Sequence, residues 1–272
     1  MAQRTNGTGL REDLYAEPDL SRLVGSDRVL AVLKELAHWP EGITLDDMAR
    51  AVDSPKPTVH RALAALRRAG FAHHDGHGRY SLGDEFLRLA FTHHEARPDH
   101  VRVGPVLRQL AERFGETTHF GVLDDREIVY RAKVDPPGGP VRLTSTVGGR
   151  NPAHSTAIGQ LLLAWRLCDP DSVREWVAKA PLERRTPQTL VTAEELHARF
   201  AIIREQGYAV DDQANEPWIN CLAIAVSSYP GAMPSGAISI SALAYRTPFQ
   251  ALVDALPEIH AIAGSLTDRG AA

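Results

Sequence analysis

The sequence contains very little cysteine. Its 272 residues include only Cys168 and Cys221, which have no C-x-x-C spacing. This excludes a disulfide-stabilised scaffold and a cysteine-based zinc or redox motif. No apolar run approaches the roughly 18 residues that a membrane helix needs, and no apolar export segment lies near the N-terminus. We therefore expect a cytoplasmic protein with no membrane partner, stabilised by the packing of its core.

Common catalytic signatures are also missing. The sequence has no G-x-S-x-G, G-x-x-x-x-G-K-[ST], H-E-x-x-H or G-x-G-x-x-G motif. A nucleophile pair of Cys221 and His154 is conceivable, but nothing in the sequence brings the two together. The histidines lack the spacing of a four-ligand zinc site. We expect no catalytic residues, no metal and no cofactor.

The charge is distributed unevenly along the chain. Hydrophobic residues make up 43% of the sequence and the net charge is −4, which is ordinary for a globular protein. Residues 54–79, however, carry five Lys/Arg and one acidic residue, so the remainder of the chain is strongly acidic. Four histidines add hydrogen-bond donors to this basic segment. A compact basic module within an acidic chain indicates a local nucleic-acid surface.

The basic segment belongs to a region with the element order of a winged helix-turn-helix. Apolar periodicity predicts a helix from Ser26 to about residue 37, a short helix over 45–52 and a third helix that Gly70 ends. We expect Ser54 to cap this third helix, with prolines at its first and third positions, where an N–H is not needed. Residues 71–82 then predict two short strands around a glycine-rich turn.

The rest of the chain mixes strands and helices. Apolar residues over 84–96 predict a connecting helix, and Arg97-Pro98 marks a break before the next helix. The candidate strands are 119–123, 128–132, 141–144, 208–211, 219–226 and 237–243, and the candidate helices are about 98–114, 155–165, 171–180, 192–206 and 249–266. Strands in two groups around helices predict an α+β domain with an antiparallel sheet.

The third helix has the chemistry of a DNA-recognition helix. Its exposed face is cationic and polar, which suits base edges in the major groove, while lysine, arginine and the helix N-terminus suit phosphates. The alternative is a winged helix that contacts another protein. The candidate DNA-binding residues are Ser54, Lys56, Pro57, Thr58, His60, Arg61, Arg67 and, in the wing, Arg79.

Several separated motifs carry a family resemblance. Residues 45–66, LDDMARAVDSPKPTVHRALAAL, closely resemble the helix-turn-helix of the IclR family of bacterial transcriptional regulators. Further segments are similar to other motifs of that family, in the family's order: Gly78–Gly83, Gly148–Gly159, Gly207–Asp212, Glu216–Ala223 and Ala237–Ser241. The resemblance covers about Ser26 to Leu266.

The resemblance implies a DNA-binding domain followed by a GAF-like α+β sensor domain. The expected segments are a flexible arm at 1–21, a winged helix-turn-helix at 22–83, a linker helix at 84–97 and an effector-binding and oligomerisation domain at 98–272. The family's ligand-facing positions correspond here to Ala157, Ile158, Asp211, Cys221, Ser239 and Ser241, and we add Trp218 beside them. Ser239 and Ser241 share one strand face by the two-residue period.

The sequence departs from the family pattern at several positions. Asp53 replaces a usual glycine in the helix-turn-helix turn, where aspartate tolerates a left-handed backbone. Trp218 replaces a frequent glycine, and Ala157-Ile158 replace a smaller pair. These larger residues favour an aromatic or branched acid as the ligand. The helix N-terminus near 154–156 favours its carboxylate, because the free N–H groups there carry partial positive charge.

We therefore interpret the chain as a ligand-responsive DNA-binding transcriptional regulator that senses a small organic acid. Because a single winged helix needs a partner for specificity, we expect a homodimer or a dimer of dimers on a pseudo-palindromic double-stranded operator. The alternative is a metabolite-binding enzyme or sensor whose winged helix mediates protein contacts.

Overall fold

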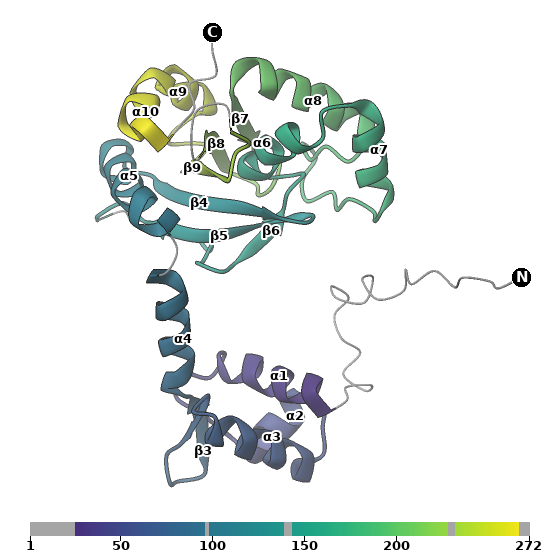
Figure 1. Ribbon diagram of the computed structural model, residues 1–272, viewed down its shortest axis with the longest axis vertical. Helices are drawn as coiled ribbons and strands as arrows, with labels where there is room; N and C mark the ends of the chain where they lie inside the picture. The colour runs from purple at the N-terminus through teal and green to yellow at the C-terminus, as the bar shows by residue number, and fades with distance from the viewer. Residues whose placement is uncertain (1–24, 96–97, 139–142, 228–231, 267–272) are drawn as a thin grey trace, which may run out of the picture. The chain divides into compact units, whose positions relative to one another are not determined.

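The computed structural model describes residues 25–95, 98–138, 143–227 and 232–266 (Figure 1). The expected arm at 1–21 lies outside them. The chain divides into two compact units, Met1–Ala96 and Arg97–Ala272. None of the described helices is long and apolar enough to cross a membrane.

The N-terminal unit is a winged helix-turn-helix. Its helices are α1 (Gly25–Leu36), α2 (Leu45–Ala51) and α3 (Lys56–Arg68), and its strands are β1 (Ile43–Thr44), β2 (Ala72–His74) and β3 (Arg79–Leu82). The strands form an antiparallel sheet in the order β1-β3-β2, to which β1 adds a strand that the sequence did not predict. The core contains Val32, Met48, Val59 and Leu63, all fully buried, so the apolar stripes of the three helices meet.

The turn between α2 and α3 confirms one expectation and corrects another. Asp53 has a φ of 42°, the left-handed conformation expected where glycine is usual. Ser54 does not cap α3, because the N-cap residue is Pro55 and no side chain accepts a hydrogen bond there. Pro57 contributes to this: with Ser54 as N-cap it would stand at the third helical position, and its missing N–H removes one of the two donors that a capping hydroxyl can accept from. The Ser54 hydroxyl is buried without a partner among the described residues.

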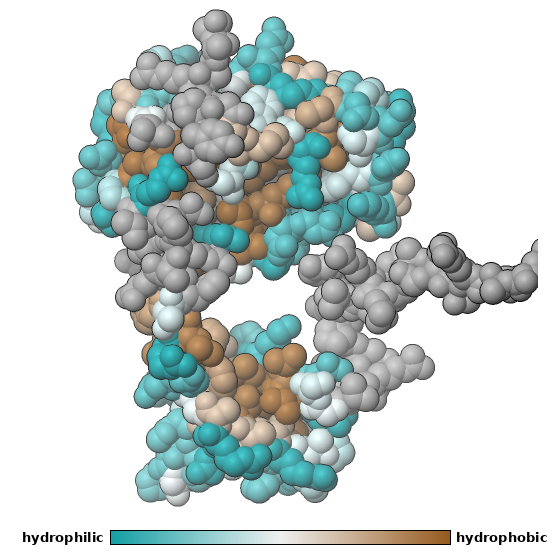
Figure 2. All heavy atoms as spheres, viewed as in Figure 1, coloured by the Kyte–Doolittle hydropathy of each residue, from teal (hydrophilic) through white to brown (hydrophobic). Residues whose placement is uncertain are grey.

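Helix α4 (Asp84–Glu95) follows the wing and buries no side chain among those described. Phe86, Leu87, Leu89 and Phe91 are each at least 42% exposed. Figure 2 shows apolar residues at the surface of the N-terminal unit, over α4 and over α1, where Leu30 is also exposed. A helix this apolar and this exposed offers a surface for association.

The C-terminal unit is built on one antiparallel sheet with helices on both faces. Its strands are β4 (Thr117–Asp124), β5 (Glu127–Val134), β6 (Arg150–Pro152), β7 (Tyr208–Asp212), β8 (Ile219–Val226) and β9 (Gly236–Leu243). Their order is β6-β5-β4-β9-β8-β7. The sheet brings β4 next to β9, which lies more than 100 residues further along the chain, with His119 opposite Ser239. This pairing confirms the expected α+β class.

Each face of the sheet has its own hydrophobic core. One core packs α6 (Ala157–Arg166), α7 (Pro170–Ala178) and α8 (Ala193–Gln206) on the sheet. The other packs α5 (Pro98–Phe114), α9 (Phe249–Asp254) and α10 (Leu256–Ala263) on the opposite face (Figure 1). The final 3-10 turn, Gly264–Leu266, extends α10.

Two predicted elements differ in the structure. A strand was expected over 141–144, but residues 141–142 lie outside the described residues and residues 143–144 belong to no strand. The strand that pairs with β5 at this edge of the sheet is β6. The expected single helix 249–266 is divided at Ala255. Pro257 explains the division, because proline has no N–H to donate to the carbonyl of Val253 four residues earlier.

Candidate functional site

A cavity lies between the N-terminus of α6 and the sheet. About 470 Å³ of it is free of protein atoms, counting the part open to solvent. The lining residues come from all six strands of the sheet, from the start of α6 and from two loops: His119, Tyr130, Leu143, Thr144, Ser145, Asn151, Thr156, Ala157, Ile158, Asp211, Asn215, Glu216, Ile219, Cys221, Ser239 and Ser241. This mixture of apolar walls with a few polar groups is typical of a small-molecule site.

A chain of polar contacts crosses the cavity floor. The Cys221 thiol donates to Ser241 Oγ at 3.1 Å, and Ser241 Oγ lies 3.4 Å from His119 Nδ1. His119 Nε2 is in turn 2.8 Å from Ser145 Oγ. Three strands and the 143–145 loop are therefore linked by side chains that all face the cavity. Ser239 lines the same floor, and its hydroxyl makes no hydrogen bond to the part of the chain that the structure describes, so it is available to a ligand.

The titratable groups of the floor are held neutral by burial. Burial, helped by the positive charge of Lys133, lowers the pKa of His119 to about 3. A neutral imidazole donates from one nitrogen and accepts at the other, and its two hydroxyl neighbours can satisfy both. Burial also raises the pKa of the Cys221 thiol well above its usual value. The thiol is therefore a poor nucleophile at neutral pH.

Asp211 is the buried acid of the cavity. Its Oδ1 accepts the N–H groups of Ala214 at 2.6 Å and Asn215 at 3.2 Å, which orders the turn after β7. Burial nevertheless raises the pKa of Asp211 to about 7, because these two hydrogen bonds only partly offset the loss of water. Glu216 is the second carboxyl group of the lining, and the described lining contains no lysine or arginine.

The N-terminus of α6 forms another wall. Thr156 is the N-cap and accepts the N–H of Gly159 at 3.1 Å. The N–H groups of Ala157 and Ile158 precede the first helical hydrogen bond and have no partner within the helix. Gly159 is required here because a Cβ would lie 2.2 Å from the carbonyl oxygen of Ala153. The close approach keeps the helix start against the sheet.

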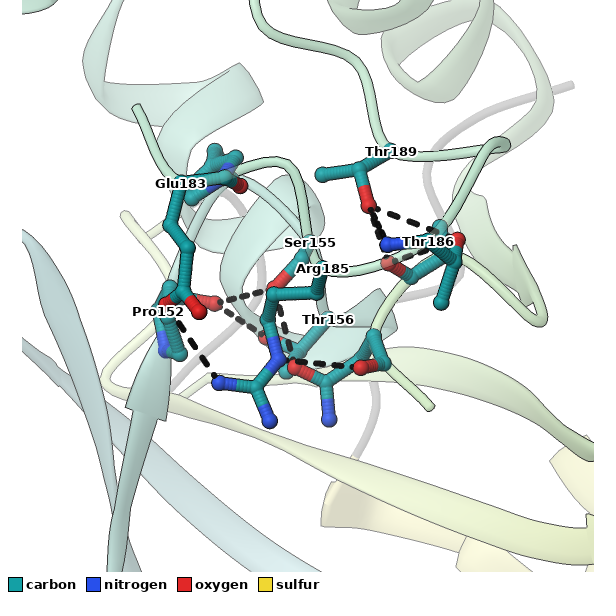
Figure 3. Close-up of polar contacts among 10 residues, drawn as sticks. Pro152, Ser155, Thr156, Glu183, Arg185, Thr186 and Thr189 are labelled. Carbon is teal, nitrogen blue, oxygen red and sulfur yellow. Dashed lines mark hydrogen bonds and ion pairs between the residues drawn. The ribbon is translucent and has the colours of Figure 1, made fainter. Parts of the chain in front are cut away.

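Polar contacts outside the cavity join this helix start to the turn after β7 and fix that turn from a neighbouring loop (Figure 3). Ser155 Oγ donates to Asn215 Oδ1 at 2.9 Å, and Arg185 Nε donates to the Asn215 carbonyl at 2.9 Å. Thr186 and Thr189 donate to the carbonyls of residues 213–214. The turn that carries Asn215 and Glu216 is therefore fixed from behind by the 185–189 loop.

The structure brings six of the seven residues predicted for ligand binding together in the cavity. Trp218 is the exception: it is not in the lining and is 67% exposed. It occupies the turn before β8 with a φ of 68°, a conformation that explains the frequent glycine there. The Trp218 indole therefore does not line the cavity, and the expected contact with a ligand there is wrong for this structure.

The sequence reasoning missed several lining residues. His119 and Tyr130 stack with ring centroids 4.6 Å apart, and Asn151 donates to the Tyr130 hydroxyl at 3.2 Å. Asn215 and Glu216 were also missed. Alternation within β4 and β5 marks the inward side of each strand, but only the pairing of β4 with β9 places His119 beside the predicted serines.

Cys221 and His154, considered above as a nucleophile pair, do not lie together in the structure. His154 Nε2 lies 2.9 Å from the carbonyl of Glu183, and His154 is outside the cavity lining. Burial lowers the pKa of His154. The two side chains serve different parts of the domain.

Helix α3 presents its polar face to solvent. Val59, Ala62, Leu63 and Leu66 are buried, which leaves the predicted contact residues on the opposite side. Lys56, Pro57, His60, Arg61 and Arg67 are exposed, Thr58 is half-buried and Ser54 is buried. Lys56 Nζ forms an exposed ion pair with Asp46 at 2.8 Å, which a phosphate can replace.

The wing is ordered by Asp75. Its Oδ1 accepts the N–H groups of His77 at 2.7 Å and Arg79 at 3.0 Å, and these hydrogen bonds lower the pKa of Asp75. Arg79 also donates from Nη1 to the carbonyl of Gly42 at 2.9 Å. The Arg79 side chain is thus anchored at the residue before β1, and Arg79 remains exposed.

Comparison with known proteins covers both units. Residues 26–76 match the model of the IclR helix-turn-helix domain, and residues 100–267 match that of the bacterial transcriptional regulator IclR C-terminal domain. The HTH-type transcriptional regulator KdgR of Dickeya chrysanthemi is 31% identical over 259 residues, covering 94% of this chain and 82% of the relative.

Two solved structures share the fold. A transcriptional regulator from Rhodococcus sp. RHA1 has a TM-score of 0.74 and 28% identity, covering 88% of this chain and 94% of that one. An IclR homologue from Microbacterium hydrocarbonoxydans, solved in complex with 4-hydroxybenzoate, has a TM-score of 0.70 and 22% identity, with 86% and 97% covered. The second likeness shows the fold alone.

Proposed function

Because this chain belongs to the IclR family of bacterial transcriptional regulators, we propose that its cavity binds a small organic acid that changes operator affinity. The family establishes a DNA-binding helix-turn-helix and an effector-binding C-terminal domain. The proposal adds the class of effector, the residues that hold it and the assembly on DNA. A regulator of the bacterial chromosome works in the cytoplasm, and we propose that location here.

The observation that carries the proposal is the pairing of an open helix start with a free hydroxyl in one cavity. The N–H groups of Ala157 and Ile158 offer donors and partial positive charge to a carboxylate. Ser239 adds a hydroxyl from the floor. Since the described lining holds no lysine or arginine, binding of the anion depends on these neutral donors.

The carboxyl groups of the lining define the rest of the ligand. Asp211 and Glu216 can accept hydrogen bonds from a ligand hydroxyl, so a hydroxy acid fits better than a plain hydrocarbon acid. Ile158 packs over Gly121, where an added Cβ would lie 3.2 Å from two Ile158 carbons. The Tyr130 ring and Ile158 provide the apolar surface for an aromatic or branched body.

For DNA binding we propose that α3 enters the major groove and that the wing follows the backbone. Arg61 and Arg67 are exposed on the polar face of α3, and Arg79 is exposed on the wing. A second copy is needed for the other half-site. We propose that the exposed apolar side chains of α4 pair two copies into a homodimer that reads a pseudo-palindrome.

The experiment combines two measurements on the full chain. Thermal shifts with a panel of small acids, including 4-hydroxybenzoate and its deoxy analogue benzoate, identify a binder, because a ligand that prefers the folded state raises Tm. Operator binding is then measured with and without that acid. A binder that leaves operator affinity unchanged would contradict the sensor mechanism. If only neutral analogues raise Tm, the proposal that the effector is an acid is wrong.

A further inference from the structure

We propose that Lys133 is the positioning residue of the effector cavity: it fixes the outer wall, which we call the strap, formed by Leu143, Thr144 and Ser145. This rests on the proposed function only in treating the cavity as the effector site. All three strap residues line that cavity, whereas Lys133 does not touch it. Lys133 therefore acts on the ligand through the strap.

The contacts of the ammonium group support this role. Lys133 Nζ donates to the carbonyls of Leu143 and Ser145, at 2.8 Å each, and pairs with Asp135 at 3.2 Å. These three partners match the three donors of an ammonium group. The side chain is only 11% exposed, so water competes little for them. Asp135 is itself held by Thr117 Oγ1 at 3.1 Å.

Lys133 and the cavity floor are joined at the same place. Lys133 on β5 is the cross-strand neighbour of His119 on β4. His119 bonds the Ser145 side chain at 2.8 Å while Lys133 bonds the Ser145 carbonyl. The strap is thus held at Ser145 from two adjacent strands, and Lys133 also holds Leu143.

The strap has little else among the described residues to keep it in place. Residues 143–145 belong to no strand or helix, so no backbone ladder holds them. Thr144 is exposed, and Leu143 and Ser145 are half-buried. Hydrogen bonds to a charged donor are stronger than neutral ones. Loss of the Lys133 ammonium should therefore release the strap and leave the sheet intact.

Cys221 provides a probe that requires neither ligand nor DNA. It lies in the cavity lining with the strap, so iodoacetamide must enter the cavity to reach its thiol. All variants are labelled at the same alkaline pH, because the raised pKa of the thiol makes it a poor nucleophile at neutral pH. In a Cys168→Ser background, which removes the exposed thiol, labelling of Cys221 is followed by mass spectrometry. We expect Cys221 to be labelled about tenfold faster in Lys133→Met than in wild type. This factor corresponds to a destabilisation of the closed strap by about 1.4 kcal/mol.

Matched variants separate positioning from general stability. Lys179→Met removes an exposed lysine from the end of α7 and should label at the wild-type rate. Lys133→Gln retains amide donors, so its Cys221 labelling rate should lie between those of wild type and Lys133→Met. This variant allows the test if Lys133→Met folds poorly. Hydrogen exchange should accelerate at residues 143–149 and remain unchanged in β4.

Two results would overturn the proposal. The first is a Cys221 labelling rate in both Lys133 variants within twofold of wild type. The second is a faster labelling rate that increases steeply when small amounts of urea are added, accompanied by faster hydrogen exchange in β4. That combination would report global unfolding. Since neither measurement involves an effector or an operator, a negative result here leaves the proposed function standing, and failure of the sensor mechanism leaves the strap result standing.

Discussion

Asp211 on β7 and Cys221 on β8 lie directly opposite each other in the sheet, and both side chains line the cavity. Their proximity has an electrostatic consequence: after burial, the charge of Asp211 is the next cause that raises the pKa of the Cys221 thiol. The state of Asp211 therefore influences both the thiol and any anionic ligand.

We predict that the affinity for an acid ligand falls as pH rises through about 7. Burial raises the pKa of Asp211 to about 7, so the group is neutral below this value and repels an anion above it. The fall should approach, at most, about tenfold per pH unit. Asp211→Asn, whose amide oxygen can still accept from Ala214, should give a flat profile by calorimetry between pH 6 and 8.5. A wild-type profile that is equally flat would contradict the role of Asp211.

The same group predicts a pH dependence of stability. The folded pKa of Asp211 lies above its unfolded value, so the folded state binds more protons and this contribution to stability is lost as pH rises from about 4 to 7. His119, whose folded pKa is lowered to about 3, acts in the opposite direction, and its contribution is fully present only above about 6.5. Urea unfolding of Asp211→Asn relative to wild type isolates the first effect. The variant's advantage should grow over that pH window.

Ser239 and Ser241 should respond differently to truncation. Ser239→Ala removes a hydroxyl free for the ligand, so it should cost about 0.5–1.5 kcal/mol of binding and leave stability nearly unchanged. Ser241→Ala breaks the contacts to Cys221 and His119 and should also lower Tm. Calorimetry with any acid that binds wild type, together with thermal unfolding, distinguishes the two. Unchanged affinity in the double variant would place the ligand elsewhere.

Gly159→Ala should destabilise the C-terminal unit by about 1–3 kcal/mol, because the added methyl meets the backbone of Ala153 and forces the start of α6 away from it. The matched control is Gly104→Ala within α5, where the nearest atom lies 3.8 Å away. That substitution should stabilise by up to about 1 kcal/mol through helix propensity. Equal denaturation midpoints for the two variants would show that the close approach is unimportant.

Arg61→Ala and Arg79→Ala should affect DNA binding in different ways. If Arg61 pairs with a guanine, its loss should cost about 1–3 kcal/mol and relax preference at one operator position. Arg79→Ala should weaken binding to all DNA sequences and reduce the slope of log affinity against log salt concentration by about one. Because Arg79 also holds the Gly42 carbonyl, the unfolding curve of this variant is needed as a control. Wild-type affinity and preference in both folded variants would remove α3 and the wing from the interface.

Substitution on α4 tests the assembly. Leu87→Lys and Phe91→Lys place charges on exposed apolar positions, so they should weaken self-association by at least about tenfold without lowering Tm. Sedimentation and operator footprinting report the result. Met233→Lys, an exposed apolar position in the other unit, is the control. A wild-type mass and a two-half-site footprint in the α4 variants would contradict pairing through this helix.

Local sequence patterns were sufficient for most elements. The 3.6-residue period located α1 through α4, and the positive φ at Asp53 was expected because the resembling family usually has glycine there and aspartate tolerates that backbone. Such features depend on neighbours within a few residues. The cap of α3 was mispredicted although it is local, because the missing N–H of Pro57 was counted as harmless and its loss as a donor to Ser54 was not considered.

The family resemblance located six lining residues, but their physical arrangement required the tertiary structure. His119 and Ser239 are adjacent only through the β4–β9 register, and Lys133 reaches Ser145 only because β5 runs beside β4. The sequence by itself determined the elements, the basic helix and the identity of the cavity serines, since these follow from local periodicity and matching motifs. Tertiary packing alone decided that Trp218 faces solvent, that burial raises the pKa of Asp211, and that a lysine outside the cavity holds its wall, because each depends on contacts between distant segments.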